Sequence, residues 1–206
     1  MMRIFSILAV AICLLSPFQA QAVALTPDQM ALAEKLREYL NSLKTLKGSF
    51  AQISSNGAYA DGKVVLSRPG KMRLTYNPPS KTEIIVRNGT IIYHDKEFRQ
   101  VTYYPLDATP LAVLLKDKLS FKEDVNIIDV SKSPGVIELT LVDREDPGMG
   151  SVTLVFSDSP LELRKWTVVD AQGIMTQVSL LNVVMGAPVS TKQFDFVDPQ
   201  YGKQDN

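Results

Sequence analysis

The fold is decided by residues 62–104, which read GKVVLSRPGKMRLTYNPPSKTEIIVRNGTIIYHDKEFRQVTYY. Apolar and polar residues alternate along much of this stretch. Met72, Leu74 and Tyr76 share one face of an extended segment, and basic and hydroxyl residues share the other. This alternation is typical of an antiparallel sheet with one buried face and one solvated face. Asn88-Gly89 separates two such runs and predicts a two-residue hairpin turn.

Short apolar runs separated by turn residues continue through the rest of the chain. Pro134-Gly135, Pro147-Gly148 and Gln172-Gly173 mark turns between them. About ten or eleven strands are predicted in this way: residues 48–53, 63–68, 72–76, 82–87, 90–94, 99–104, 125–130, 136–142, 152–156, 161–169 and 174–184, with a last short strand around Phe194 and Phe196. Such a series predicts a mainly β protein with one large antiparallel sheet that curls toward a barrel.

Two predicted helices interrupt the strands. Residues 27–46 carry leucines and a tyrosine at steps of three and four, which predicts one amphipathic helix. Thr26 and Gln29 have the spacing of a capping box at its start. Thr109-Pro110 opens a second, short and apolar helix over residues 112–118. We expect both helices to cover the apolar side of the curved sheet.

Residues 1–22 have the composition of a Sec export signal. Arg3 supplies the positive region, an apolar run follows, and Ala20-Gln21-Ala22 is a small-x-small cleavage site. A membrane anchor is the alternative, but about twelve apolar residues are too few to span a bilayer, which takes roughly twenty. A lipoprotein signal at Cys13 is disfavoured because Ile12 is too large for the position before a lipidated cysteine. We therefore expect a mature, periplasmic protein that begins after Ala22.

Removal of this signal leaves one predicted domain, residues 23–206, which must fold without covalent cross-links. Cys13 is the only cysteine in the chain, and it leaves with the signal. The full chain balances 22 basic against 22 acidic residues, and only Arg3 is lost. A near-neutral protein has no electrostatic footprint for nucleic acid. We expect the domain to act as a monomer and to bind no nucleic acid.

The chain offers little for covalent chemistry. His94 is the only histidine, and no serine lies in a Gly-x-Ser-x-Gly elbow, so a hydrolase is disfavoured. His94 is interpreted instead as a surface residue of a strand. Asp143, Glu145 and Asp146 lack the spacing of a calcium loop, and we interpret them as part of a solvated hairpin. The sequence therefore predicts a protein that is not an enzyme and uses no metal or cofactor.

A binding role uses the long apolar face that the chain does have. Each methylene group moved out of water contributes about 0.8 kcal/mol, so a dry wall can hold acyl chains without hydrogen bonds. The candidate wall comprises Val64, Leu66, Met72, Leu74, Tyr76, Ile84, Val86, Ile91, Tyr93, Leu111, Leu114 and Leu115. A curved sheet can also fill its apolar face with its own core. Periodicity alone does not separate a cavity from a packed interior.

The order of signals between residues 62 and 115 resembles the LolA family, the periplasmic carriers of outer-membrane lipoproteins. The matching features are Arg68-Pro69 at a strand end, Tyr76 with Pro78 or Pro79, Asn88-Gly89, Gln100, and a Thr-Pro-Leu start before Leu114-Leu115. The resemblance implies a strongly twisted, incompletely closed antiparallel barrel of about eleven strands under a helical lid. In such a carrier, the cavity between barrel and lid takes the acyl chains of lipoproteins.

The resemblance also implies partners and a role for Arg68. An inner-membrane ABC-type exporter would load the carrier with acylated lipoproteins, and an outer-membrane receptor would take them. Arg68 would donate hydrogen bonds to backbone carbonyls of the lid and hold the free form closed. A guanidinium suits this role because it offers several fixed donors and keeps its charge. Without the resemblance, Arg68 is interpreted as a strand end before a proline.

Two departures from the family pattern concern the cargo. Met72 and Leu74 stand where the family usually has aromatic residues, and the tail after Phe196 is short. A carrier of another lipid, a glycolipid or a pigment is therefore one alternative. A regulatory protein that senses mislocalised lipoproteins is another, but we expect such a protein to need a second domain, for which this chain has no room.

Overall fold

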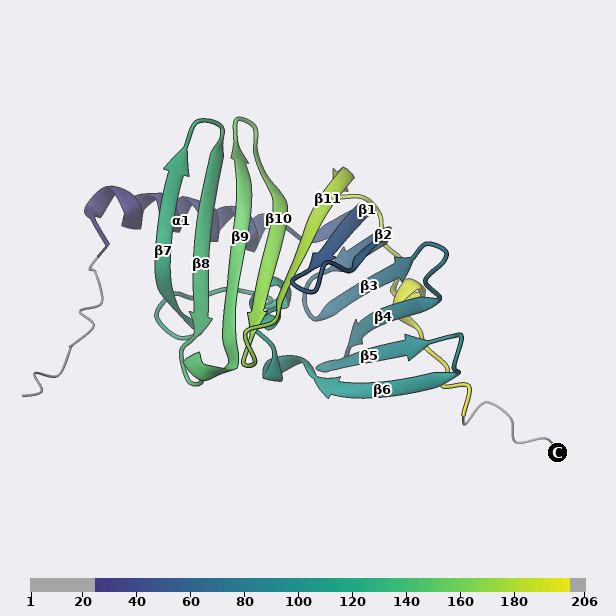
Figure 1. The fold of residues 1–206 in the computed structure, drawn as a ribbon. Helices are drawn as coiled ribbons and strands as arrows, with labels where there is room; N and C mark the ends of the chain where they lie inside the picture. Colours follow the sequence, from purple (N-terminus) through teal and green to yellow (C-terminus); the bar gives the residue numbers. More distant parts are fainter. Residues whose placement is uncertain (1–24, 201–206) are drawn as a thin grey trace, which may run out of the picture.

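A computed structural model of the chain describes residues 25–200. These residues form one antiparallel sheet of 11 strands in the order β6-β5-β4-β3-β2-β1-β11-β10-β9-β8-β7 (Figure 1). The strands are β1 (Thr45–Ser54), β2 (Tyr59–Ser67), β3 (Lys71–Tyr76), β4 (Thr82–Arg87), β5 (Thr90–Asp95), β6 (Gln100–Pro105), β7 (Val125–Ser133), β8 (Val136–Asp143), β9 (Gly150–Asp158), β10 (Leu161–Asp170) and β11 (Met175–Met185). β6 and β7 lie at the two ends of this order, so the sheet is not closed. The predicted mainly β fold with an open sheet is confirmed.

Within residues 25–200, the helical elements are few and short apart from the first. They are α1 (Pro27–Ser42), the one-turn α2 (Ala112–Leu115), and three 3₁₀ turns, η1 (Leu106–Ala108), η2 (Pro147–Met149) and η3 (Thr191–Phe194). Figure 1 shows α1 running behind β7–β10. Within the part of the chain that the structure describes, none of the helices is both long and apolar enough to cross a bilayer.

Helix α1 begins where the sequence predicts and ends earlier. The capping box is present: the Gln29 amide donates to Thr26 Oγ1 at 3.2 Å, and the Thr26 amide donates to Gln29 Oε1 at 2.9 Å. The helix stops at Ser42, because Leu43 is extended and β1 starts at Thr45. The prediction of one helix to residue 46 was wrong. Leu43 and Leu46 are both buried, so the apolar spacing continues while the backbone changes from helix to strand.

The main core lies on the concave side of the sheet. Strand register places Phe50 opposite Leu180 on one side and opposite Gly62 on the other, and these positions alternate with solvated ones. Ala33, Leu36 and Leu40 of α1 are buried in the same cluster as the inward residues of β8–β10. Helix α1 thus covers one half of the concave face, that of β7–β10.

A second, smaller core lies on the convex side of β3–β5, under the C-terminal segment. Ile85 and Ile92 are buried there, and η3 packs against β3 and β4 with Phe194 only 2% exposed. Arg73 Nη1 donates to the carbonyl oxygen of Gln193 at 3.0 Å, and Arg87 pairs with Asp195 at 3.7 Å. These contacts fix the segment to the outer surface of the sheet.

This second core corrects two sequence predictions. The expected last strand around Phe194 and Phe196 is wrong, because residues 191–194 form a 3₁₀ turn and residues 195–198 have no regular structure. His94 does lie in a strand, but it is half-buried rather than on the surface. Its ring contacts Phe196 edge to face, with ring centroids 5.3 Å apart.

The other differences are at element boundaries. Strand β2 starts at Tyr59, four residues before the predicted strand of residues 63–68. The second helix spans Ala112–Leu115 instead of residues 112–118, because Lys116 is extended with ψ 145°. The predicted signal peptide, residues 1–22, lies outside the described residues.

Replacing Phe194 with alanine tests whether the C-terminal segment stabilises the sheet. Removing a fully buried phenylalanine side chain typically lowers the free energy of unfolding by about 3–5 kcal/mol. We expect a loss in the lower part of this range, measured by urea unfolding, together with faster amide exchange in β3–β5. Val197→Ala is the matched control, because Val197 is 78% exposed. Equal stability of the two variants would contradict a stabilising role for this segment.

Candidate lipid site under a helical lid

Seven of the twelve predicted wall residues form part of a filled interior. They lie at 4% exposure or less: Val64, Leu66, Met72, Leu74, Val86, Leu114 and Leu115. All belong to the main core cluster, in which α2 contributes the two leucines. They form the floor of the concave face, and of the seven only Leu115 lines one of the surface pockets found among the described residues, together with Leu106 and Ala112.

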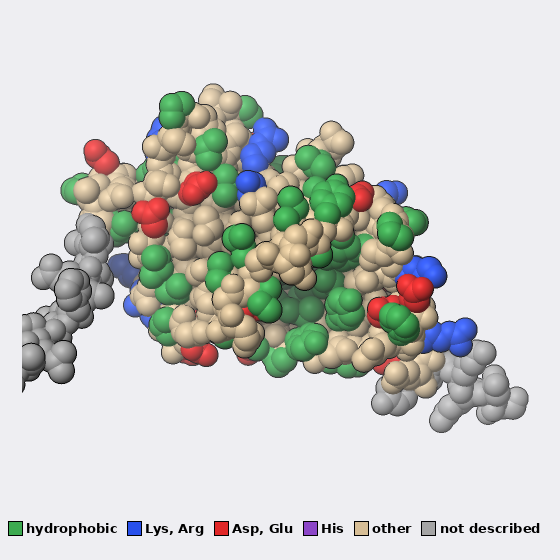
Figure 2. All heavy atoms as spheres, viewed as in Figure 1, with side chains coloured by type: hydrophobic (Ala, Val, Ile, Leu, Met, Phe, Trp, Pro, Cys, Tyr) green, Lys and Arg blue, Asp and Glu red, His purple; other side chains and the backbone are tan. Residues whose placement is uncertain are grey.

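The remaining five wall residues are accessible to different degrees. Tyr76, Ile84, Ile91 and Leu111 are half-buried against the core, and Tyr93 is 37% exposed. Ile84 pairs with Tyr93 across β4 and β5, and both continue the inward row that contains Leu74. Figure 2 shows the surface hollowed between the β10–β11 turn and strands β5 and β6, with apolar side chains lining the hollow. The predicted face is therefore a packed floor whose inward row becomes more accessible toward β5.

Sequence reasoning missed Tyr104 as part of this face. Tyr104 of β6 lies opposite Ile91 and is 53% exposed, so it extends the inward row to the edge of the sheet. Its neighbour Tyr103 lies on the other face, where its hydroxyl donates to Asp198 at 2.5 Å. The alternation of side chains along a strand, applied to β6, would have assigned Tyr103 and Tyr104 to opposite faces of the sheet.

Tyr76 is held at the end of β3 by two contacts. Its ring packs edge to face on Phe50, with centroids 5.1 Å apart, and its hydroxyl donates to Gln52 Oε1 at 2.6 Å. Gly62 lies between the two rings in the register, where a β-carbon would approach the Thr75 carbonyl oxygen to 2.2 Å. Only glycine leaves room for this arrangement. Burial, reinforced by the nearby Tyr93, raises the pKa of Tyr76 to about 12, although the bond to Gln52 acts in the opposite direction.

Helix α2 is docked on the sheet through its C-terminal carbonyls. Arg68 Nε donates to the carbonyl oxygen of Lys116 at 2.6 Å, and the Gly70 amide donates to that of Leu115 at 2.9 Å. Arg68 is only 7% exposed. Its Nη1 and Nη2 atoms are buried without a hydrogen-bond partner among the described residues. Burial lowers the pKa of the Arg68 guanidinium, while the charge of Asp117 raises it.

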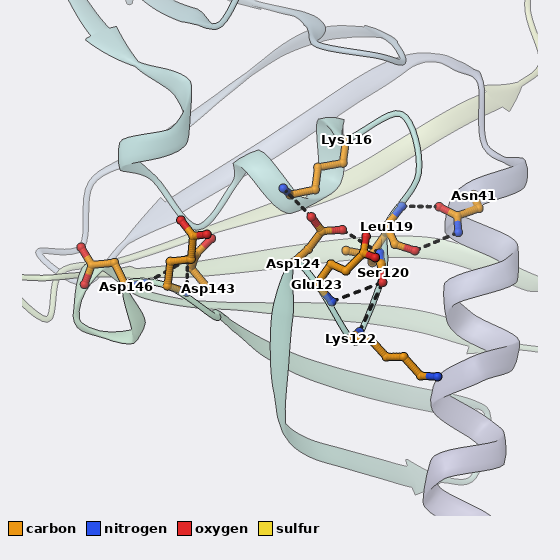
Figure 3. Close-up of polar contacts among 10 residues, drawn as sticks. Asn41, Lys116, Leu119, Ser120, Lys122, Glu123, Asp124, Asp143 and Asp146 are labelled. Carbon is orange, nitrogen blue, oxygen red and sulfur yellow. Dashed lines mark hydrogen bonds and ion pairs between the residues drawn. The ribbon is translucent and has the colours of Figure 1, made fainter.

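A polar clasp joins α1 to the loop that follows α2 (Figure 3). The Asn41 side chain donates to the carbonyl oxygen of Leu119 at 3.1 Å and accepts from the Leu119 amide at 2.8 Å. Lys116 Nζ lies 2.9 Å from Asp124 Oδ1, and the Ser120 amide donates to the other oxygen of Asp124. α1, α2 and this loop therefore form one connected cover, which we call the lid.

An acidic pocket of about 480 Å³ lies next to the clasp. Its lining includes Asp124, Asp143 and Asp146, which Figure 3 places around the β8–β9 turn and the lid loop. Asp143 Oδ1 accepts from the amides of Glu145 and Asp146 and so closes its own turn. Among residues 25–200 there is no group of three or more histidine, cysteine or acidic residues that could hold a metal ion.

Comparison with known proteins agrees with this geometry. Residues 41–197 match the family described as outer membrane lipoprotein carrier protein LolA. The chain belongs to the LolA family. It is 27% identical to the outer-membrane lipoprotein carrier protein of Methylococcus capsulatus over 174 residues, 80% of this chain and 83% of the relative. It is 26% identical to the protein of the same name from Nitrosomonas europaea over 212 residues, 97% of each chain.

The solved structure of one distant relative shows the same fold at low sequence identity. The crystal structure of a Vibrio parahaemolyticus domain named for outer membrane lipoprotein sorting covers 81% of this chain and 95% of its own, with a TM-score of 0.51 and 9% identity. A LolA superfamily protein from Nitrosomonas europaea covers 84% of this chain and 99% of its own, with a TM-score of 0.47 and 13% identity.

The raised pKa of Tyr76 predicts a loss of stability at alkaline pH. The unfolded chain releases the Tyr76 proton near pH 10 and the folded chain near pH 12, so rising pH favours unfolding within this window. The full shift corresponds to about 2–3 kcal/mol. We expect Tyr76→Phe to lose less stability than the wild type between pH 10 and pH 12, measured by urea unfolding. Parallel losses in the two proteins would show that Tyr76 titrates as an exposed tyrosine does.

Proposed function

We propose that this LolA family member is a periplasmic carrier that binds the acyl chains of lipoproteins between its sheet and its lid. The observation that carries the proposal is the apolar hollow on the concave face of β4–β6, which opens beside the buried floor (Figure 2). The names of the curated relatives support lipoproteins as the cargo. The site offers binding chemistry, and the proposed activity is transport rather than catalysis.

The closed form requires a movement of the lid before it can take a whole acyl chain. Leu114 and Leu115 of α2 belong to the same buried core cluster as Leu66 and Met72, so a chain that enters this interior from the hollow must displace them. Each buried methylene group contributes about 0.8 kcal/mol, and several chains together can offset the lost leucine contacts. The unbranched side chain of Met72 adapts easily to a new neighbour. The packed floor is therefore compatible with a cavity that forms on loading.

Arg68 is suited to act as the latch of this lid. Its bond to the Lys116 carbonyl closes α2 onto the sheet, yet two of its nitrogens remain buried without partners. A desolvated charge with incomplete hydrogen bonding raises the free energy of the closed form. Opening of the lid would return these donors to water. Arg68 therefore holds α2 on the sheet, but the free energy difference between the closed and open forms stays small.

The carrier role implies a route across the periplasm. An inner-membrane ABC-type exporter is the proposed source of acylated lipoproteins, and an outer-membrane receptor is the proposed acceptor. The predicted signal peptide supports export to this compartment. A carrier of another lipid is the competing proposal, and the aliphatic residues Met72 and Leu74 favour a deformable wall that could take one. Mass spectrometry of material that co-purifies from the native periplasm distinguishes the two cargoes.

Tyr93→Glu tests the hollow without disturbing the packed floor. Because Tyr93 is 37% exposed, the carboxylate can reach water, and we expect the fold to survive. A charge in an apolar path should weaken binding of a triacylated lipopeptide and of a fluorescent apolar probe by about tenfold or more. Val184→Glu is the control, since Val184 is 58% exposed on the convex side of β11. Equal binding by Tyr93→Glu and wild type would place the site elsewhere.

Arg68→Leu tests the latch. The variant leaves the Lys116 carbonyl without its donor, and a charge-assisted hydrogen bond is worth about 1.5–3 kcal/mol. The Gly70 amide is the reporter, because it is protected by the Leu115 carbonyl of α2. We expect its hydrogen exchange to accelerate by about tenfold or more, while the melting transition stays cooperative. Arg164→Leu is the exposed control. Unchanged hydrogen exchange at Gly70 would show that Arg68 does not hold α2 on the sheet.

A further inference from the structure

One polar pair interrupts the apolar concave face next to the hollow. Gln52 lies opposite Ala60 on β2 and opposite the buried Val178 on β11, so it shares the inward row with Phe50. Its Oε1 accepts the Tyr76 hydroxyl at 2.6 Å. Tyr76 follows Leu74 on the inward row of β3, and Leu74 connects across β4 to Tyr93 through Ile84. The pair therefore lies where the β1 and β3 ends meet the candidate site.

The pair presents donors that the protein itself does not use. The Gln52 oxygen is taken by Tyr76, which leaves the two amide hydrogens on Nε2. Nε2 makes no hydrogen bond with residues 25–200, and it is not among the buried unpartnered atoms, so it keeps contact with solvent. Tyr76 also fixes the rotation of the amide, because Phe50 holds the tyrosine ring in place. The free N–H groups are thus oriented and not freely rotating.

We infer that Gln52, oriented by Tyr76, binds a carbonyl oxygen of the acyl ester linkage of the cargo. This inference rests on the proposed function. Acyl chains need no hydrogen bonds, but the ester carbonyls at their heads lose water when the chains enter an apolar wall. A carbonyl buried without a donor is costly, and a preoriented amide removes this cost. The pair would then select acyl esters over hydrocarbon chains of the same length and would set how deeply they enter.

The test compares two synthetic lipopeptides on the mature protein. One carries a dipalmitoylglyceryl group on its N-terminal cysteine, and the other carries the matching dihexadecylglyceryl ether, which lacks the carbonyls. One net hydrogen bond corresponds to about a three- to tenfold difference in Kd. We expect the wild type to prefer the ester by this factor. We expect Gln52→Leu to bind the ester as weakly as the ether, with its affinity for the ether unchanged.

Two further variants keep the result interpretable. Gln52→Leu alone leaves the Tyr76 hydroxyl without its acceptor. The double variant Gln52→Leu with Tyr76→Phe removes that hydroxyl, so it remains folded if the single variant does not. We expect the double variant to bind ester and ether equally. Gln177→Leu makes the same change on the convex face of β11, and we expect this variant to keep the preference for the ester.

Three results would overturn the inference. Equal binding of ester and ether by the wild type would show that the protein does not recognise the ester carbonyl. Equal weakening of both ligands in Gln52→Leu would make Gln52 a wall residue. If the wild type binds neither lipopeptide, the result contradicts the proposed function and therefore also the inference.

Discussion

The apolar concave face of an open sheet is the constraint on which the rest of this structure depends. β6 and β7 are the two end strands of the sheet, and helix α1 covers the half formed by β7–β10. The one-turn α2 closes the middle of the concave face with Leu114 and Leu115, and the half formed by β4–β6 keeps an apolar hollow (Figure 2). An apolar surface left partly uncovered by its own chain is typical of a site that another molecule completes.

The two sides of the β3–β6 half are held in different ways. On the outside, Phe194 fills a second core, and Arg73 and Arg87 bind the C-terminal segment along the sheet. On the inside, α2 is held by backbone carbonyls, one of which accepts from the incompletely paired Arg68. The wall of the hollow is therefore stiffened from behind, while its cover in the middle of the face is the single turn of α2, held by its buried leucines and a few polar contacts. This asymmetry makes the lid, rather than the sheet, the element expected to move during loading.

Local patterns in the sequence predict most of the sheet but little about whether its interior is filled. The period of two places Met72, Leu74 and Tyr76 on one face, and Asn88-Gly89 marks the β4–β5 hairpin correctly. The same period cannot show that Leu74 is 4% exposed while Tyr93 is 37% exposed, because this depends on how far α1 and α2 reach. The prediction of a strand around Phe194 was wrong for a related reason. The apolar residues there pack on the outer face of the sheet but form no strand of it. The contact between Gln52 and Tyr76 joins β1 to β3 across 24 positions, which no local pattern reveals.

Photo-crosslinking tests most directly whether the hollow and the space under the lid receive acyl chains. A triacylated lipopeptide with a diazirine near the end of each chain is irradiated on the mature protein, and the labelled residues are mapped by mass spectrometry. Binding between sheet and lid predicts labels on inward residues such as Ile84, Ile91 and Tyr104, and on Leu114 of α2. Labels confined to the exposed convex residues Leu181 and Val184, or scattered over both faces, would contradict a cavity under the lid.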